Sequence, residues 1–367
     1  MRSRITVTAV AVLAVAAMAG CSSSKPTSTS PPTTPTAPTT PTTNTAPAVN
    51  SPSSGPSESG SDAASTAAFP VPTKPDKSYK LTFIEGVKGD PFYATMSCGI
   101  QSEAARLGAT VNITGGGTWD ASVQTPIVTS VTAQHPDAVL IAPNDTKAMI
   151  APLKQMTDAG IKLVLVDTGL DDNSNAESFI TSDNEAGGKL AADTLAGLIG
   201  GAGSVFVMNV QPGISTTDAR AKGFAEEMAA KYPNVKVLDT QYNGDDPAKA
   251  ASILTSELSA HPDLAGVFAT NVQGAEGTAT GLKQASKQGK VQVIGFDAGA
   301  QQIQDLQNGV VQGLIAQDPA TIGVDGVDQA IAALSGQTVT PTIQTGLVAL
   351  TKDNLAANAK YEYKTSC

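Results

Sequence analysis

Two stretches of this chain repeat each other: Gln134-His135-Pro136-Asp137-Ala138-Val139-Leu140 and Ala260-His261-Pro262-Asp263-Leu264-Ala265-Gly266-Val267-Phe268. Each stretch begins at the end of an amphipathic segment, continues with a His-Pro-Asp turn and ends in an apolar segment. The next apolar segment ends in an aspartate in both cases, Asp167 and Asp297, which follow the two histidines by 32 and 36 positions. The matched order and spacing indicate that one structural unit occurs twice.

Apolar strands alternate with amphipathic helices around both stretches, as in a parallel sheet covered by helices. The first half is predicted to hold strands over residues 80–85, 109–113, 138–141 and 162–166, and helices over 93–107, 121–134 and 147–159. After a helix over 184–199, the second half is predicted to hold strands over 204–209, 235–239, 266–269 and 291–296, and helices over 218–231, 248–260 and 274–289. The sequence predicts an α/β fold of two similar, doubly wound parallel-sheet lobes.

The N-terminus has the pattern of a secretory signal over residues 1–20. Two arginines precede an apolar stretch over residues 5–17, which is too short to remain as a membrane-spanning helix. Met18-Ala19-Gly20-Cys21 closes it and resembles the lipobox of bacterial lipoproteins, although methionine is unusual at its position there. The resemblance implies lipidation of Cys21; the alternative is ordinary secretion with an incidental cysteine.

The segment after Cys21 is expected to be an extended tether over residues 21–77. Of the 39 residues from Ser22 to Gly60, 29 are Ser, Thr or Pro, so this segment cannot bury enough apolar surface to fold. A lipid anchor on a long tether suits a domain on the extracytoplasmic face of a bacterial cell membrane.

The remaining residues, from Ser78 onward, suffice for two lobes. The signal holds two arginines and no acid, so its removal changes the net charge from −10 to −12. This charge argues against nucleic acid as a partner, since phosphates require a basic surface. Cys98 and Cys367 are then an even number of cysteines in an oxidising compartment, which favours a disulfide between them. The alternative is a buried Cys98 with a free thiol at Cys367.

Ligands of open parallel sheets bind at the carboxyl ends of the strands. His135 and His261 precede strands, so we expect both to be structural. The segments that follow strands are rich in aspartate and include Asn271, Arg220 and aromatic side chains. Carboxylates accept hydrogen bonds from hydroxyl groups and aromatic rings cover the apolar face of a sugar, so a neutral sugar or polyol fits better than a phosphorylated ligand. Asp145 and Asp183 are instead expected to cap helices.

Catalytic motifs are scarce. Gly115-Gly116-Gly117 follows a strand without completing a dinucleotide fingerprint, and Gly200-Gly201-Ala202-Gly203 precedes a strand as a turn would. We therefore predict a protein that is not an enzyme and needs no cofactor or metal. Paired carboxylates in a cleft leave glycoside hydrolysis as an alternative.

Several short motifs occur in an order that resembles the sugar-binding proteins of bacterial ABC importers, in the ribose-binding group. They are Gly89-Asp90-Pro91-Phe92-Tyr93, Ser182-Asp183-Asn184, Ala219-Arg220-Ala221-Lys222-Gly223-Phe224, Ala269-Thr270-Asn271, Gly295-Phe296-Asp297, Ile315-Ala316-Gln317 and Ile322-Gly323. The resemblance covers residues 78–350 and implies three crossovers, near 182–184, 317 and 345, with a ligand cleft between the lobes. Lobe 1 would comprise residues 78–183 and 318–345, and lobe 2 residues 184–317 and 346–367.

The resemblance also implies a set of ligand-binding residues. Asp90, Phe92, Tyr93, Asp167, Asn271, Asp297 and Gln317 match sugar-binding positions of the family. Ala142 stands where ribose binders have asparagine, Asp218 replaces an arginine although Arg220 follows, and Asp245 takes the approximate place of an aromatic residue. These departures argue against ribose itself. Trp119 is expected either to supply the missing aromatic face or to pack against its lobe.

The function implied is that of a monomeric, lipid-anchored binding protein that captures a sugar or polyol and delivers it to an ABC import permease. Two alternatives stay open. One is a ligand sensor that presents its closed form to a membrane receptor, and the other is a lipid-anchored glycoside hydrolase.

Overall fold

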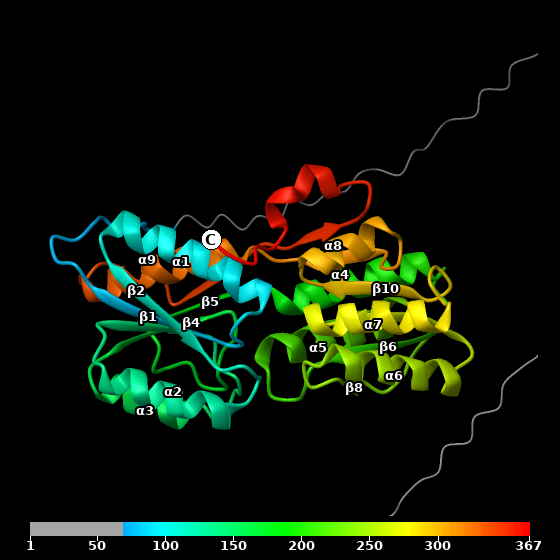
Figure 1. The fold of residues 1–367 in the computed structure, drawn as a ribbon, viewed down its shortest axis with the longest axis horizontal. Helices are drawn as coiled ribbons and strands as arrows, with labels where there is room; N and C mark the ends of the chain where they lie inside the picture. Colours follow the sequence, from blue (N-terminus) through cyan, green and yellow to red (C-terminus); the bar gives the residue numbers. More distant parts are fainter. Residues whose placement is uncertain (1–68) are drawn as a thin grey trace, which may run out of the picture. The chain divides into compact units, whose positions relative to one another are not determined.

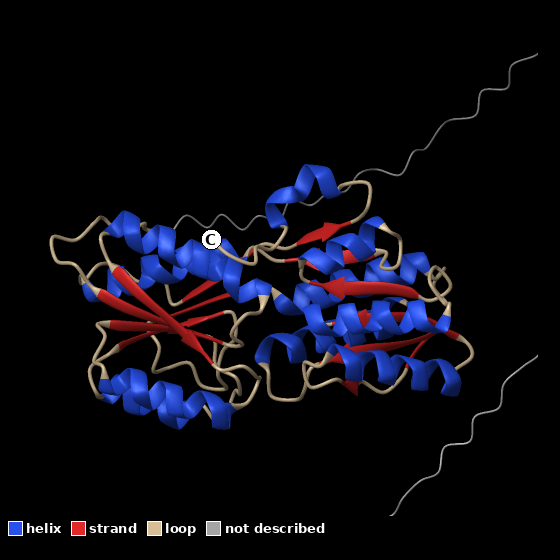
Figure 2. Ribbon diagram, in the orientation of Figure 1, coloured by secondary structure: helices blue, strands red, loops and turns tan. Residues whose placement is uncertain are grey.

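The computed structural model describes residues 69–367. The predicted signal, the lipidation site Cys21 and most of the predicted tether lie outside these residues. No helix between residues 69 and 367 combines the length and the apolar character needed to cross a membrane. Two sheets organise this part of the chain (Figures 1 and 2).

The first sheet, with its helices, is called lobe 1 here. Its strands are parallel and lie in the order β2-β1-β3-β4-β5-β12. They are β1 (Lys80–Glu85), β2 (Thr110–Gly115), β3 (Ala138–Ile141), β4 (Lys162–Val166), β5 (Ser178–Ser182) and β12 (Thr342–Thr345). The helices that pack on it are α1 (Pro91–Leu107) and α9 (Pro319–Leu334), which contact each other, and α2 (Ala121–Ala133) and α3 (Ile150–Asp158), which form a second pair.

The second sheet, with its helices, is lobe 2. Its strands follow the corresponding order β7-β6-β9-β10-β11-β13, in which the edge strand β13 is antiparallel, while β8 pairs with the end of β6. They are β6 (Gly203–Asn209), β7 (Val235–Val237), β8 (Gln241–Tyr242), β9 (Leu264–Ala269), β10 (Gln292–Phe296), β11 (Gly313–Ala316) and β13 (Val348–Leu350). The helices are α4 (Asn184–Leu198), α5 (Ser215–Lys231), α6 (Pro247–Ala260), α7 (Val272–Ala285) and α8 (Ala300–Gln307), with a 3-10 helix η1 (Leu355–Tyr361) near the C-terminus.

The shared strand order confirms two similar, doubly wound α/β lobes. Within residues 69–367 the chain passes between the sheets three times, after β5, after β11 and after β12, as expected for three crossovers. The predicted residue limits of the lobes remain a prediction. Cys98 in α1 is joined to Cys367 by a disulfide with Cα atoms 5.3 Å apart.

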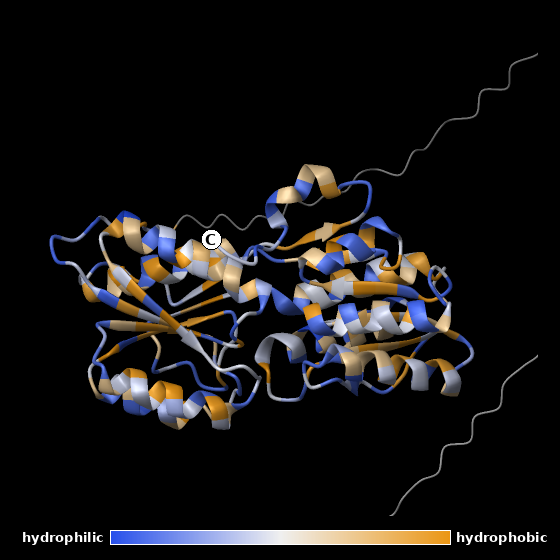
Figure 3. Cartoon of the chain, viewed as in Figure 1, coloured by the Kyte–Doolittle hydropathy of each residue, from blue (hydrophilic) through white to orange (hydrophobic). Residues whose placement is uncertain are grey.

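The strands carry the apolar core. All four residues of β3 are buried, as are the last four of β4 and of β10, which is typical of parallel strands covered on both faces. Figure 3 shows hydrophobic residues concentrated along the strands and hydrophilic residues in the loops. Burial on both faces explains why these strands were recognisable as short continuous apolar runs.

Helix α1 shows how local sequence sets an element's limits. The Asp90 side chain accepts a hydrogen bond from the Phe92 N–H, Pro91 occupies the first helical position, and Gly108 ends the helix at a φ of 74°. Aspartate as N-cap, proline at the first position and a left-handed glycine after the last turn are the usual limits of a helix.

Some predicted limits were wrong by a few residues, and some elements were not predicted. Helix α5 begins at Ser215 rather than Asp218. Helix α3 begins at Ile150 rather than Lys147, because a turn capped by Asp145 precedes it. The elements not predicted are β5, β8, α8, β11, α9, β12, β13 and η1. Helix α9 is buried on most of its surface, so the polar face that reveals an amphipathic helix is missing.

Glycines bring two pairs of helices close together. A Cβ atom on Gly223 of α5 would lie 2.2 Å from the Glu185 carbonyl oxygen, and one on Gly188 of α4 would lie 2.1 Å from the Arg220 carbonyl oxygen. In lobe 1, a Cβ atom on Gly99 of α1 would lie 2.2 Å from the Ala320 carbonyl oxygen, and one on Gly323 of α9 would lie 2.5 Å from the Met96 carbonyl oxygen. The two crossover helices α4 and α9 are therefore packed in the same way, and the first of these contacts positions Arg220.

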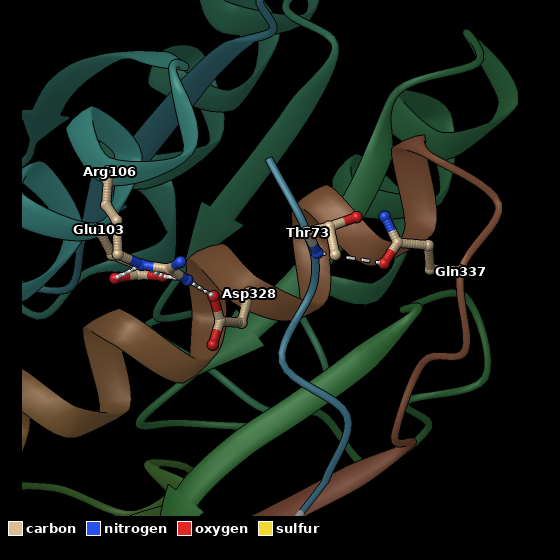
Figure 4. Close-up of polar contacts among 5 residues, drawn as sticks. All are labelled: Thr73, Glu103, Arg106, Asp328 and Gln337. Atoms are coloured by element: carbon tan, nitrogen blue, oxygen red, sulfur yellow. Dashed lines mark hydrogen bonds and ion pairs between the residues drawn. The ribbon is translucent and has the colours of Figure 1, made fainter. Parts of the chain in front are cut away.

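Figure 4 shows two sets of polar contacts in lobe 1, one between α1 and α9 and one at the segment after α9. Arg106 donates to Glu103 on its own helix and, at 3.4 Å, to Asp328 of α9. The backbone N–H of Thr73 donates to Gln337 Oε1 at 3.4 Å, which connects the first described residues to the segment after α9. Arg106 is half-exposed, so we assign this ion pair a minor part in stability.

Candidate functional site

A cavity lies between the two lobes, at the carboxyl ends of the strands. Its space is about 380 Å³, counted to include the part open to solvent. The residues that line it come from loops and helix starts of both lobes: Asp90, Phe92, Tyr93, Trp119, Asp167, Val210, Thr216, Thr217, Arg220, Asn271, Val272, Asp297 and Gln317.

Lobe 1 contributes an aromatic wall and two carboxylates. The Tyr93 hydroxyl donates to Asp167 Oδ2 at 2.7 Å, and both residues are buried. The centre of the Tyr93 ring lies 5.2 Å from that of the Phe92 ring, in an edge-on arrangement, and 6.1 Å from that of the Trp119 ring. Trp119 thus lines the cavity and also packs against its own lobe, and its role as an aromatic face for a sugar stays a prediction.

Lobe 2 contributes one cation, Arg220, which is buried. Its Nε donates to Asn184 Oδ1 at 2.8 Å and its Nη1 donates to the Thr270 carbonyl at 2.7 Å. The guanidinium carbon lies 3.7 Å from the centre of the Phe296 ring. These contacts fix the side chain of Arg220 at the cavity wall, a property that planar guanidinium groups provide and lysine does not.

Asp297 also belongs to lobe 2, and hydrogen bonds from other side chains hold its carboxylate. Its Oδ1 accepts from Gln317 Nε2 at 2.7 Å and from the Tyr363 hydroxyl at 3.0 Å. Asn271 also lines the cavity, and its Nδ2 donates to Asp245 Oδ1 at 2.7 Å. The N-cap residues of α7 and α8 are Asn271 and Gly299, and the Asp297 carboxylate also accepts a hydrogen bond from the backbone of Val272 at the start of α7.

Among the fully buried side-chain atoms of the described lining residues, two have no hydrogen-bond partner: Gln317 Oε1 and Thr217 Oγ1. Both residues are buried. Buried polar atoms in proteins are almost always hydrogen-bonded, so these two atoms are suited to meet the hydroxyl groups of a ligand.

Hydrogen bonds between the lobes border the cavity. Gln211 Nε2 donates to the Trp119 carbonyl at 3.1 Å, and the Thr146 N–H donates to the Gly213 carbonyl at 3.0 Å. The Gly169 N–H donates to Ser215 Oγ at 2.8 Å. The lobes are therefore in direct contact in this structure, as a closed binding protein requires.

Burial changes the protonation of the cavity's acids. Removal from water, together with the negative charge of Asp297, raises the pKa of Asp90 to about 8. Burial also raises the pKa of Asp167 to about 6, against the opposing effect of Arg220. The pKa of Asp297 is raised for the same reason, with Arg220 again opposing. Three acids around one cation favour a neutral ligand rich in hydroxyl groups and disfavour an anion.

The structure brings together nine of the eleven residues predicted to bind ligand, and the other two, Asp218 and Asp245, are not among the residues that line the cavity. Asp218 lies in the first turn of α5, where its carboxylate accepts from the Gly213 N–H at 2.8 Å and does not line the cavity. Asp245 accepts a hydrogen bond from Asn271, which lines the cavity, and its charge acts on Asp90 and Asp297. Asp183 caps α4 as predicted, whereas Asp145 caps the turn before α3 and not the helix itself.

Sequence reasoning missed Val210, Thr216, Thr217 and Val272 at the cavity wall, and Tyr363 behind it. The first four belong to segments that directly follow β6 and β9, which the strand-end rule indicates without singling out these side chains. His135 and His261 lie at the opposite ends of β3 and β9 and do not line the cavity.

The fold and the site define a class: a two-lobed α/β binding protein that holds a small polar ligand between its lobes. Residues 82–338 match the family described as periplasmic binding protein domain, and the chain belongs to that family. The chain is 30% identical over 259 residues to the ribose import binding protein of Escherichia coli, which covers 71% of this chain and 86% of the relative.

Solved structures are similar over most of the described residues. One is an ABC transporter solute-binding protein from Agrobacterium vitis, bound with α-D-tagatopyranose; its TM-score is 0.76 and its identity 41%, covering 78% of this chain and all of that one. Another is a carbohydrate transporter solute-binding protein from Agrobacterium radiobacter in complex with D-arabinose, with a TM-score of 0.74, an identity of 28%, and coverage of 78% and 98%. The resemblance to the ribose-binding group is thereby confirmed: this is a sugar-binding protein of the ABC-importer type and not an enzyme.

Proposed function

We propose that this protein captures a neutral monosaccharide or a related polyol on the extracytoplasmic face of a bacterial cell membrane and delivers it to an ABC import permease. The observation that carries the proposal is the cavity between the lobes, to which lobe 1 contributes Asp167 and lobe 2 contributes Asp297 and Arg220. A ligand bound by both lobes favours the closed form, which a permease can distinguish from the open one.

The chemistry of the cavity defines the class of ligand. Carboxylates accept hydrogen bonds from hydroxyl groups, Arg220 donates to ring or carbonyl oxygens, and the rings of Phe92 and Trp119 cover apolar C–H faces. The similar structures that hold D-tagatose and D-arabinose support a ketohexose or an aldopentose as the first candidates. Because Arg220 is the one cation among the lining residues, a phosphate group would meet a net negative wall.

Isothermal titration calorimetry tests this assignment directly. The purified chain without residues 1–20 is titrated with D-tagatose, D-arabinose, D-ribose, D-allose, xylitol and D-ribose 5-phosphate. We expect at least one neutral compound to bind with a dissociation constant in the micromolar range or below, and the phosphate to show no binding. No binding by any neutral compound, or tighter binding of the phosphate, would contradict the proposal.

The anchor is proposed from Cys21 and the Ser/Thr/Pro-rich segment that follows it. We expect the wild-type protein to sediment with membranes and Cys21→Ser to be released into the soluble extracytoplasmic fraction. Cys367→Ser serves as the matched control, because it removes a cysteine and leaves the lipidation motif intact. Equal membrane retention of Cys21→Ser and wild type would contradict lipidation at this residue.

A further inference from the structure

The last six residues, 362–367, pass from lobe 2 to lobe 1 beside the cavity (red to α1 in Figure 1). The Tyr363 N–H donates to the Ala298 carbonyl of lobe 2 at 3.0 Å. The Lys364 N–H donates to Thr95 Oγ1 of α1 at 2.7 Å. The disulfide to Cys98, also on α1, then fixes the end of the chain to lobe 1.

Tyr363 is the buried residue of this C-terminal segment and contacts the cavity wall from behind. Its hydroxyl donates to Asp297 Oδ1 at 3.0 Å and accepts from the Gln317 N–H at 3.3 Å. Its ring meets the Phe92 ring edge-on at 5.8 Å. One side chain therefore contacts lining residues of both lobes without lining the cavity itself.

The contact with Asp297 determines how this carboxylate can meet a ligand. Oδ1 accepts from both Tyr363 and Gln317, and two donors on one oxygen fix the plane of the carboxylate. Gln317 Nε2 is thereby occupied, which leaves Gln317 Oε1 as the atom of that amide without a partner. The orientation of both polar groups thus depends on the tyrosine.

The disulfide explains why Tyr363 can stay in place so near a chain end. The last residues of a chain are usually poorly ordered unless they are attached, and residues 364–367 are exposed. Apart from the disulfide, the contacts of Lys364 with Thr95 hold this part of the segment on lobe 1.

We propose that the C-terminal segment is a part of the ligand site, in which Tyr363 positions Asp297 and Gln317 and the Cys98–Cys367 disulfide holds Tyr363 in place. This inference rests on the proposed function, since it concerns the same cavity. Tyr363 is a positioning residue, because it acts through Asp297 and does not itself line the cavity.

The test compares Tyr363→Phe, Cys98→Ser and Cys367→Ser with wild type by calorimetric titration with D-tagatose, and with each other neutral compound that wild type binds. We expect Tyr363→Phe to weaken binding about tenfold, as loss of a hydrogen bond to a charged group does. The two serine variants should weaken binding equally, since they break the same bond. Adding Cys367→Ser to Tyr363→Phe should weaken binding no further, because both act through one contact. Tyr361→Phe is the matched control, because Tyr361 is half-buried and lies two residues before Tyr363. This variant should bind sugar as tightly as wild type does.

The pH profile of affinity separates positioning from a purely structural role. The hydrogen bond from Tyr363 lowers the pKa of Asp297, so Tyr363→Phe should shift the acidic decline in affinity to higher pH. Other groups facing Asp297 are Arg220, Asp90, Asp167 and Asp245, and they are common to both proteins. Tyr361→Phe should leave the profile unchanged.

A measurement without ligand keeps the two proposals distinct. Hydrogen exchange of the segment around Asp297 in the sugar-free protein should be faster in Tyr363→Phe and Cys367→Ser than in wild type and Tyr361→Phe. If wild type binds no compound, the proposed function fails, while the exchange data still decide whether the segment holds Asp297. If wild type binds and all three variants match it in affinity, or if exchange is unchanged, the inference on the C-terminal segment is wrong.

Discussion

Asp90 is a cavity residue through which pH should act on stability. Its pKa is raised from the ordinary value to about 8, mainly by removal from water. Between about pH 4 and pH 8 the folded protein holds a proton on Asp90 that the unfolded chain releases, so the free energy of unfolding falls as pH rises across this window. Asp90→Asn cannot titrate, and asparagine also caps helices well.

We therefore expect the difference in free energy of unfolding, Asp90→Asn minus wild type, to increase by roughly 1 kcal/mol or more when the pH is raised from 5 to 8. Urea unfolding of the sugar-free protein at the two pH values measures this difference. Asp120→Asn, which alters an exposed N-cap at α2, should run parallel to wild type. A constant difference between Asp90→Asn and wild type would show that Asp90 is ionised throughout.

At the residue scale, sequence could identify the acids of the cavity because strand ends mark them. Asp167 and Asp297 were identified by their matched places in the two halves, and both adopt a positive φ. Asp218 was assigned to a ligand position by resemblance, and in the structure its carboxylate accepts a hydrogen bond within its own loop. Tyr363 gave no signal, since it lies 66 positions from Asp297 and follows no strand of the predicted pattern.

At the element scale, the contact between α4 and α5 determines where Arg220 lies. A Cβ atom on Gly223 would lie 2.2 Å from the Glu185 carbonyl oxygen, and backbone cannot yield as a side chain can. We expect Gly223→Ala to lower the free energy of unfolding by about 2 kcal/mol, as overpacking of a core does. Sugar affinity should fall too, because the displaced α5 carries Arg220.

Gly197→Ala is the matched control for this prediction. Gly197 lies in α4 with nothing within 4 Å of its Cβ position, so alanine should stabilise the helix by about 0.5–1 kcal/mol. Thermal unfolding with and without sugar compares the two variants. Equal behaviour of Gly223→Ala and Gly197→Ala would contradict the close packing of α4 on α5.

Elements with a clear hydrophobic period were predictable, and those without one were not. β1, β3 and β4 were predicted with their observed limits, because each is a short apolar run next to an amphipathic helix. β12 and β13 have three or four residues each, with partly exposed side chains, so no pattern could develop. They become strands because sheets already exist beside them, which is a tertiary effect.

At the scale of the whole molecule, the proposed function requires that the two lobes share one ligand. The cavity is lined from both lobes, and hydrogen bonds such as Gln211 Nε2 to the Trp119 carbonyl hold its border. Asp167 and Asp297 are the equivalent carboxylates of the two halves, so each lobe should contribute one acceptor to the same sugar. Asparagine keeps the shape of aspartate and tolerates a positive φ, so it tests the carboxylates without straining the backbone.

The most direct test is to measure sugar affinity and sugar-free stability together for Asp167→Asn and Asp297→Asn. The controls are Asp120→Asn and Asp246→Asn, which alter exposed helix caps in lobes 1 and 2. Loss of a charged acceptor for buried hydroxyl groups costs roughly 1.5–3 kcal/mol, so each cavity variant should bind its sugar at least about tenfold more weakly. The free energy of unfolding of the sugar-free protein should not fall. Wild-type affinity in either cavity variant, accompanied by lowered stability, would contradict a ligand shared between the lobes.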